Sequence, residues 1–371
     1  MDNIAIYVHW PYCARICPYC DFNVYKERAD TDLVQAICDH IREQASWLDR
    51  RLLTSIHFGG GTPSLLGADA IDQILGEIQK AYDIGPDCEI AIEANPQDAA
   101  PRRWQAYSDV GVNRLSLGVQ SFHNPALTLL GRDHSADAAK AALRQAVDIF
   151  ASVSLDIIFG WAGQTVDLLQ QDLDIALNSR AQHISTYQLT IEDGTAFSKA
   201  EARGDIKSVK PDESADYYEL IRERLISKGF EHYEVSNFAR SGHRSRHNLT
   251  YWQGGDYIGV GPGAHGRLTM KGQRYATIAA MKPQAYKSSF LQDKTTLTPT
   301  EWAEEYLLMG LRIDEGISVS RFEDIGGQAL NQELIESFVG DGLMRLMQGR
   351  LSATEKGRLV LNHITEKLLV S

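Results

Sequence analysis

Short apolar stretches alternate with amphipathic segments along the first half of the chain. Six stretches rich in β-branched and aromatic residues predict strands over residues 4–10, 55–60, 89–94, 114–120, 152–160 and 183–190. Apolar residues at helical spacing predict helices over residues 33–47, 70–81, 136–149 and 166–177. Buried strands that alternate with amphipathic helices indicate βαβ units and a parallel sheet.

Polar and glycine residues follow these predicted strands at their carboxyl ends. The segments are HWPYC, GGGTP, EANP, GVQSF and DIIFG. In parallel α/β folds the ligand site is built from the loops at those ends. A doubly wound sheet fits the periodicity almost as well, but a barrel brings five successive strands to one mouth more easily. We therefore expect an α/β fold with an incomplete TIM-like (β/α)6 barrel.

The pattern changes after residue 210. A helix is predicted over residues 213–228, and the polar, glycine-rich region 233–266 has too little periodicity to predict a packed element. The last part begins with a helical segment and ends with a two-stranded turn near Gly349 and a final helix, which indicates a winged-helix-like domain. We expect a barrel over residues 1–210, an extension over 211–298 and this smaller domain over 299–371.

Charge and hydropathy narrow the function classes. The 371-residue chain has a formal net charge of −12 and no basic block, which argues against nucleic acid as a partner. Acidic residues outnumber basic ones beyond residue 300, so the winged-helix-like domain is expected to pack against the barrel rather than read DNA. Without a run of roughly 18 apolar residues or a secretion signal, the protein is expected to be cytoplasmic and not an integral membrane protein.

Three of the five cysteines lie close together after the first predicted strand. Cys13, Cys17 and Cys20 are separated by four and three positions. Thiolates suit zinc, copper or iron–sulfur clusters. A structural zinc site needs a fourth ligand, for which His9 is the candidate. A [4Fe-4S] cluster held by three thiolates instead leaves one iron open for another ligand. The cluster is favoured because CxxxCxxC is not the usual paired CxxC spacing of a zinc site and the chain has no second cysteine pair.

The CxxxCxxC motif resembles that of the radical S-adenosylmethionine (SAM) superfamily. The glycine run 59–61, followed by Thr62, stands where that superfamily receives the methionine part of SAM, and small residues let the main chain approach a ligand closely. Further segments resemble the coproporphyrinogen dehydrogenase-like family over nearly the whole chain. They are YVHWPYC, CPYCDF, HFGGGTPSLL, EANP, LSLGVQSF, LGRDH, SLDIIFGWAGQT and RHNLTYW. The resemblance implies a [4Fe-4S] cluster on the three cysteines and SAM as a cofactor.

The same resemblance implies a set of SAM contacts at successive strand ends. These residues are Tyr7, Gly60, Gly61, Thr62, Glu93, Gln120, Arg132 and Asp156. Their chemistry fits the role, because Arg132 can pair with a carboxylate through two hydrogen bonds. Glu93 and Asp156 can accept hydrogen bonds from an ammonium group or from ribose hydroxyls.

Two departures separate this chain from the oxygen-independent dehydrogenase of that family. The dehydrogenase has a fourth cysteine two residues after the third and an extension before the first strand. In this chain Phe22 takes the place of that cysteine, and the first predicted strand begins at Ile4. Both features resemble the heme chaperone branch of the family, which also has an HNxxYW motif. The dehydrogenase, which oxidatively decarboxylates coproporphyrinogen III, remains the alternative function, and the chain is not expected to be this enzyme.

The heme chaperone resemblance implies heme as a cofactor and a heme-accepting protein as a partner. A respiratory enzyme is one candidate acceptor, which leaves transient membrane association open. The residues implied for heme binding are His247, Asn248, Tyr251 and Trp252. A neutral imidazole is a standard ligand of heme iron, and the two aromatic rings offer flat faces to a porphyrin. Further candidates are His265 for the iron and, for the propionates, Arg240, Arg244 and Arg246.

Overall fold

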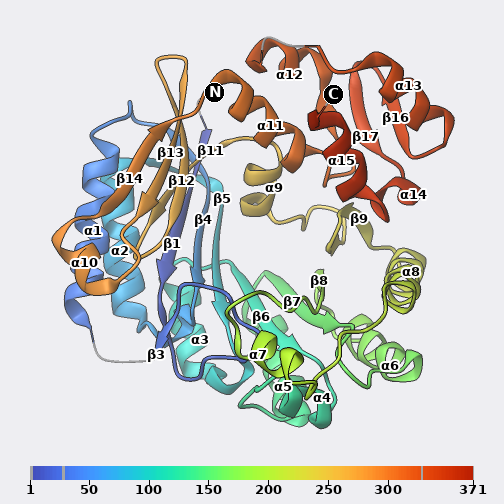
Figure 1. Cartoon of the computed structure of the whole chain (residues 1–371). Coiled ribbons are helices and arrows are strands. Elements are labelled where there is room, and N and C mark those ends of the chain that lie inside the picture. Colours follow the sequence, from blue (N-terminus) through green and yellow to red (C-terminus); the bar gives the residue numbers. More distant parts are fainter. Residues whose placement is uncertain (1–2, 27–29, 327–328, 371) are drawn as a thin grey trace.

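The main body of the protein is a twelve-stranded sheet with helices along its outer face (Figure 1). The computed structural model describes residues 3–26, 30–326 and 329–370. Six neighbouring strands pair in parallel and in chain order at the centre of the sheet. They are β1 (Asn3–Trp10), β4 (Leu52–Gly60), β5 (Asp83–Ala94), β6 (Arg114–Gln120), β7 (Ser152–Phe159) and β8 (His183–Gln188). These strands confirm the predicted α/β class and its repeated strand–helix units.

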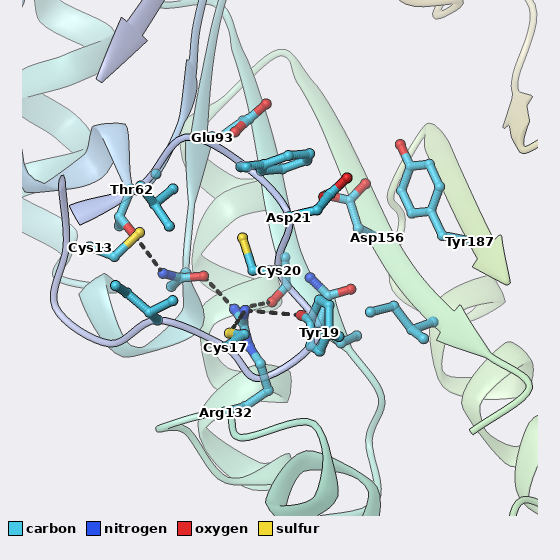
Figure 2. Close-up of a pocket in the computed structure, with 18 of the residues that line it drawn as sticks. Cys13, Cys17, Tyr19, Cys20, Asp21, Thr62, Glu93, Arg132, Asp156 and Tyr187 are labelled. Atoms are coloured by element: carbon cyan, nitrogen blue, oxygen red, sulfur yellow. Dashed lines mark hydrogen bonds between the residues drawn. The ribbon is translucent and has the colours of Figure 1, made fainter. Parts of the chain in front are cut away.

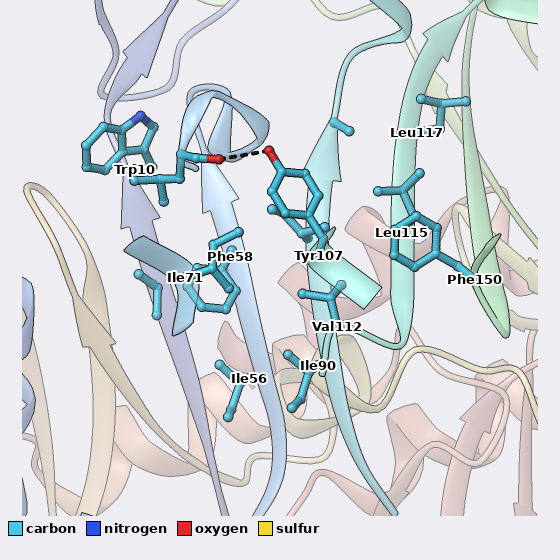
Figure 3. Close-up of a cluster of buried hydrophobic side chains, with 14 of the residues drawn as sticks. Trp10, Ile56, Phe58, Ile71, Ile90, Tyr107, Val112, Leu115, Leu117 and Phe150 are labelled. Atoms are coloured by element: carbon cyan, nitrogen blue, oxygen red, sulfur yellow. Dashed lines mark hydrogen bonds between the residues drawn. The ribbon is translucent and has the colours of Figure 1, made fainter. Parts of the chain in front are cut away.

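Amphipathic helices bury their apolar stripes against the central strands. They are α1 (Thr31–Ala45), α2 (Ala68–Ala81), α3 (Pro101–Asp109), α4 (Asn124–Leu129), α5 (Ala136–Ile149) and α6 (Val166–Leu177). In α2, Ile71, Ile74 and Ile78 share one face and are fully buried. In the same core (Figure 3) the buried Tyr107 hydroxyl is 2.8 Å from the carbonyl oxygen of Leu66 and 2.8 Å from that of Ser64, which holds the turn after the glycine run in place.

Short strands extend the sheet at both edges. On the β1 side lie β11 (Asp256–Val260), β12 (His265–Met270), β13 (Gln273–Ala279) and β14 (Leu291–Thr296), and on the β8 side lie β10 (Asn237–Ala239) and β9 (Glu231–Glu234). The prediction that residues 233–266 form no packed element is therefore wrong. That region also contains α9 (Arg246–Trp252), and its elements span only three to seven residues, too few to show a period.

The remaining barrel elements connect these layers. They are β2 (Tyr12–Cys13), β3 (Tyr25–Lys26), the 3-10 turns η1 (Pro63–Leu65) and η2 (Pro96–Asp98), α7 (Ala196–Ala202), α8 (Pro211–Ser227) and α10 (Pro283–Ser288). The pairing of β2 with β3 closes the loop that carries the cysteines. Asn23 Nδ2 in this loop donates to the carbonyl oxygens of Pro262 and Met281, at 2.9 and 2.8 Å. Within the described residues, no helix has both the length and the apolar character to cross a membrane.

The C-terminal part has its own apolar core and a three-stranded sheet. Its elements are α11 (Pro299–Gly310), β15 (Ile317–Ser318), α12 (Val319–Gly326), α13 (Gln332–Gly340), β16 (Met344–Met347), β17 (Arg350–Ala353), α14 (Glu355–Arg358) and α15 (Leu361–Val370). This order of helices followed by a hairpin is the one predicted for a winged-helix-like unit. Arg312 pairs with Glu234 at 2.6 Å, and Arg358 Nη1 donates to the carbonyl oxygen of His232 at 3.0 Å, so the unit packs on the β9 edge (Figure 1). The domain boundaries at residues 210 and 298 stay predictions.

Candidate functional site

A cavity of about 390 Å³ opens at the carboxyl ends of the parallel strands (Figure 2). Its walls come from the cysteine loop after β1 and from the ends of β4 to β8. All of the residues predicted for the cluster and for SAM line this cavity except Tyr7: Cys13, Cys17, Cys20, Gly60, Gly61, Thr62, Glu93, Gln120, Arg132 and Asp156. Parallel strands bring their carboxyl ends to one edge, which is why residues far apart in the chain meet here.

The three cysteines share this cavity as free thiols. Cys13 is buried on β2, whereas Cys17 and Cys20 are half-buried on the loop that follows. Burial raises the pKa of Cys13 to about 11 and also raises that of Cys20, so both thiols keep their protons until a cation approaches. In the described part of the chain, no group of three or more His, Cys, Asp or Glu side chains is gathered closely enough to hold a metal ion.

The glycine run brings the end of β4 directly against the cysteine loop. A Cβ atom on Gly61 would lie 2.7 Å from the Tyr12 carbonyl oxygen and 3.0 Å from Cys13 Sγ. The Gly61 amide donates to the Trp10 carbonyl oxygen at 2.7 Å, and the Thr62 amide donates to the Tyr12 carbonyl oxygen at 2.9 Å. Gly61 therefore sets the position of Cys13 at the cavity wall.

Two carboxylates face the cavity from β5 and β7 (Figure 2). Glu93 Oε2 accepts from the Gly60 amide at 3.2 Å, and Glu93 Oε1 lies 2.9 Å from His57 Nε2. Asp156 Oδ2 accepts from the Ser116 hydroxyl at 3.3 Å. Burial raises the pKa of Asp156 to about 6, so the group is mostly ionised at neutral pH. Both groups can accept hydrogen bonds from ammonium or hydroxyl groups of a ligand.

Arg132 lies in the cavity wall with its guanidinium directed at the cysteine loop (Figure 2). Its Nη1 atom donates to Cys17 Sγ at 3.2 Å, and its Nη2 atom donates to the Gly118 carbonyl oxygen at 3.0 Å and to Asn95 Oδ1. Its predicted pairing with a ligand carboxylate stays a prediction. Gln120 has a φ of 69°, which is uncommon for a residue with a side chain and marks the end of β6 as a special backbone position.

The sequence reasoning missed two residues of this site. Asn95 Nδ2 donates to the Thr62 hydroxyl at 3.2 Å, and its Oδ1 atom accepts from Arg132, so it ties the two walls together. Its position directly after the β5 strand was the available signal. His57 pairs with Glu93 and stands two positions before Gly59 on β4. The alternation of side chains along a strand puts these two residues on the same face.

Two predicted residues from β1 lie outside the cavity lining. Tyr7 places its hydroxyl 3.2 Å from His9 Nδ1, and its contact with SAM stays a prediction. His9 Nε2 lies 3.0 Å from the Asn23 carbonyl oxygen. Because both ring nitrogens of His9 have protein partners, the structure does not favour a zinc site that uses this residue.

The segment predicted to bind heme forms helix α9, away from the cavity lining. His247 is only 1% exposed. Its Nδ1 atom lies 2.9 Å from the Ser55 hydroxyl, and its Nε2 atom lies 2.5 Å from the Tyr251 hydroxyl. Burial lowers the pKa of His247 well below its usual value, so the imidazole is neutral. Both nitrogens of the imidazole, either of which could bind iron, are therefore already hydrogen bonded.

Other groups of the protein also cover the aromatic faces of α9. The Tyr257 ring packs edge-on against Tyr251 at 4.5 Å between centroids, and the Arg312 guanidinium lies 4.7 Å from the centre of the Trp252 ring. Each arginine predicted to meet a propionate has a protein acceptor, namely the Lys228 carbonyl for Arg240, Asp314 for Arg244 and the Asp87 carbonyl for Arg246. His265 is exposed at the start of β12. In this arrangement α9 offers no open porphyrin surface among the described residues.

Comparisons with known proteins agree with this fold. Residues 7–176 match the family model described as the radical SAM superfamily, and residues 297–360 match the HemN C-terminal domain. Coproporphyrinogen III oxidase (HemN) from Escherichia coli is similar in structure, with a TM-score of 0.80 at 22% identity, covering 98% of this chain and 89% of that chain. At this identity the likeness shows the shared fold.

The curated relatives match over nearly their whole length. Radical S-adenosyl methionine domain-containing protein 1, mitochondrial, from Bos taurus is 36% identical, covering 99% of this chain and 88% of the relative. Heme chaperone HemW from Haemophilus influenzae is 33% identical, covering 100% of this chain and 98% of the relative. Heme chaperone HemW from Bacillus subtilis is 32% identical, covering 97% of each chain.

Proposed function

The chain belongs to the HemW family of the radical SAM superfamily, and we propose that it is a heme chaperone that binds heme, a [4Fe-4S] cluster and SAM and transfers the heme to an acceptor protein. The observation that supports this most strongly is the single cavity in which three free thiols meet the residues predicted for SAM. The acceptor is proposed to be a heme protein, with a respiratory enzyme as the first candidate.

Cys13, Cys17 and Cys20 are the proposed cluster ligands. The donor set fits, because soft thiolates suit iron–sulfur clusters and all three thiols reach the same cavity. When bound, the cluster supplies an iron with an open coordination position to which SAM can attach. The protein's own residues position SAM: Glu93 and Asp156 accept hydrogen bonds from its polar groups, and Gly60, Gly61 and Thr62 let the main chain approach it.

Phe22 supports the chaperone over the dehydrogenase. It lies at the edge of the cavity, and the residue is 63% exposed. At this position the dehydrogenase branch has its fourth cysteine, so the cavity rim here carries an apolar ring in place of a thiol. An apolar ring cannot ligate iron, whereas it can lie against a flat hydrophobic ligand.

Heme binding is proposed at His247, Asn248, Tyr251 and Trp252. Because His247 is buried and both its ring nitrogens are hydrogen bonded, iron ligation requires the imidazole to give up Ser55 or Tyr251. We propose that α9 moves away from β4 when heme binds, which would expose the imidazole and the aromatic faces together.

Heme titration of the anaerobically reconstituted protein tests this proposal. The wild type is expected to bind heme to saturation with a defined Soret band. His247→Ala is expected to lose this band or most of the affinity, because the proposed iron ligand is gone. His363→Ala is the matched control, since His363 is an exposed histidine on α15, outside α9, and it is expected to behave as the wild type. A wild type that shows no saturable heme binding would contradict the proposal.

A further inference from the structure

We propose that His57 is a positioning residue for Glu93 and, through it, for SAM, an inference that rests on the SAM site proposed above. His57 is half-buried on β4, and its Nε2 atom lies 2.9 Å from Glu93 Oε1. The other carboxylate oxygen, Glu93 Oε2, accepts from the Gly60 amide at 3.2 Å. The glutamate is therefore held at both oxygens by the end of β4, while its side chain lines the cavity.

The imidazole of His57 is fixed by its neighbours. Its ring stacks on that of His247 at 4.8 Å between centroids and 19° between planes. It is nearly parallel to the ring of Tyr7 at 6.1 Å and 20°. The buried Nδ1 atom has no hydrogen-bond partner among the described residues, so Nε2 carries the proton and donates to the carboxylate. His57 thus has its ring plane set by packing and its one donor directed at Glu93.

Gly59 leaves the room that this pair needs. A Cβ atom at Gly59 would lie 2.9 Å from Glu93 Oε1, 3.1 Å from His57 Cδ2 and 2.7 Å from Tyr7 Cε2. The first glycine of the run therefore serves the His57–Glu93 pair, while Gly61 serves the cysteine loop. The end of β4 proposed to receive SAM therefore also positions Glu93, the carboxylate on β5 that is proposed to bind it.

This arrangement bears on SAM affinity because Glu93 is presented in one orientation. Each carboxylate oxygen keeps a free lone pair for a ligand ammonium or hydroxyl group after it has accepted its protein hydrogen bond. Without His57 the carboxylate gains rotational freedom, which binding must then remove. The loss of one hydrogen bond to a charged acceptor corresponds to a weakening of SAM binding by about tenfold.

The test is the SAM affinity of the reconstituted full-length protein, measured by anaerobic calorimetry with iron content and thermal midpoint recorded for each variant. His57→Leu is expected to bind SAM about tenfold more weakly at unchanged iron content. His57→Gln is expected to restore most of the affinity, since its amide can donate to Glu93. His40→Leu is the matched control, a buried barrel histidine that bonds Tyr286 and Gln44 and is expected to leave SAM affinity unchanged.

A double substitution shows whether His57 acts through Glu93. If it does, His57→Leu combined with Glu93→Gln binds SAM no more weakly than Glu93→Gln alone. The inference is overturned if His57→Leu binds SAM as the wild type does, if His57→Gln is as weak as His57→Leu, or if the two losses simply multiply in the double variant. A wild type that binds no SAM would overturn the proposed SAM site itself, so the two failures are distinguishable.

Discussion

A buried carboxylate, Glu89 on β5, anchors the helix proposed to bind heme. Its side chain is 8% exposed and lies 3.2 Å from Arg114 Nη1, itself only 4% exposed. Glu89 Oε1 accepts from the His247 amide at 3.2 Å, and Oε2 accepts from the Arg246 amide at 3.3 Å. One carboxylate thus neutralises a buried guanidinium and satisfies the first amides of α9, which have no partner within the helix.

Replacing Glu89 with alanine is expected to destabilise the protein by about 3 kcal/mol. Removing one partner of a buried ion pair typically costs about 3–5 kcal/mol, because the other charge stays buried. We expect the lower end of this range, since Arg114 keeps hydrogen bonds to the Ser154 hydroxyl at 2.8 Å and to the His243 carbonyl oxygen at 3.1 Å. The loss of two accepted amide hydrogen bonds adds to the effect and is concentrated on α9.

Urea unfolding measures this cost as the change in the midpoint at constant slope. The matched control is Asp83→Ala, which breaks the Arg50–Asp83 pair at 2.6 Å, with side chains 51% and 57% exposed. An exposed pair contributes about 0–1 kcal/mol, so this variant is expected to unfold close to the wild type. If Glu89→Ala lowered the free energy of unfolding by less than about 1 kcal/mol, or no more than Asp83→Ala, Glu89 would not be the anchor of α9.

Three further predictions concern the cluster cavity and the barrel core. Gly61→Ala is expected to lower iron content after reconstitution, because its Cβ would lie 2.7 Å from the Tyr12 carbonyl oxygen and 3.0 Å from Cys13 Sγ; unchanged iron content would contradict this. Cys17→Ser is expected to lose the broad visible absorption of an iron–sulfur centre, whereas Cys38→Ser, at a buried cysteine outside the cavity, should keep it. Burial lowers the pKa of His40 to about 3. Below about pH 6.5 the unfolded chain therefore binds a proton at this residue that the native imidazole does not. As the pH falls, the free energy of unfolding decreases by up to about 1.4 kcal/mol per pH unit. Urea midpoints at about pH 7.5 and about pH 5.5 should therefore differ less in His40→Gln than in the wild type, and equal differences would refute the assignment.

The central sheet and the cavity follow from local sequence patterns. Apolar runs separated by amphipathic segments were sufficient to predict the six parallel strands, because each run is long enough to show its period. Motifs directly after those runs identified the cavity, because parallel strands place their carboxyl ends at one edge. Glu93 and Asp156 reach the same cavity from β5 and β7 for this reason.

The edge strands and the state of α9 depend on contacts far along the chain. β11 pairs with β1 although about 250 residues separate them, and a strand of five residues carries too little pattern to predict that partner. The ring nitrogens of His247 are hydrogen bonded to Ser55, which is distant in sequence, and to Tyr251, its neighbour on the helix. The motif shows which side chains are present, whereas their burial is set by tertiary packing.

The assay that separates the chaperone from the dehydrogenase tests the central claim most directly. The reconstituted protein, with SAM and a reductant present, is incubated anaerobically with coproporphyrinogen III, and a parallel portion is titrated with heme. The account predicts saturable heme binding and no protoporphyrinogen above the level of a Cys17→Ser control. Protoporphyrinogen formation by a protein that binds no heme would contradict it.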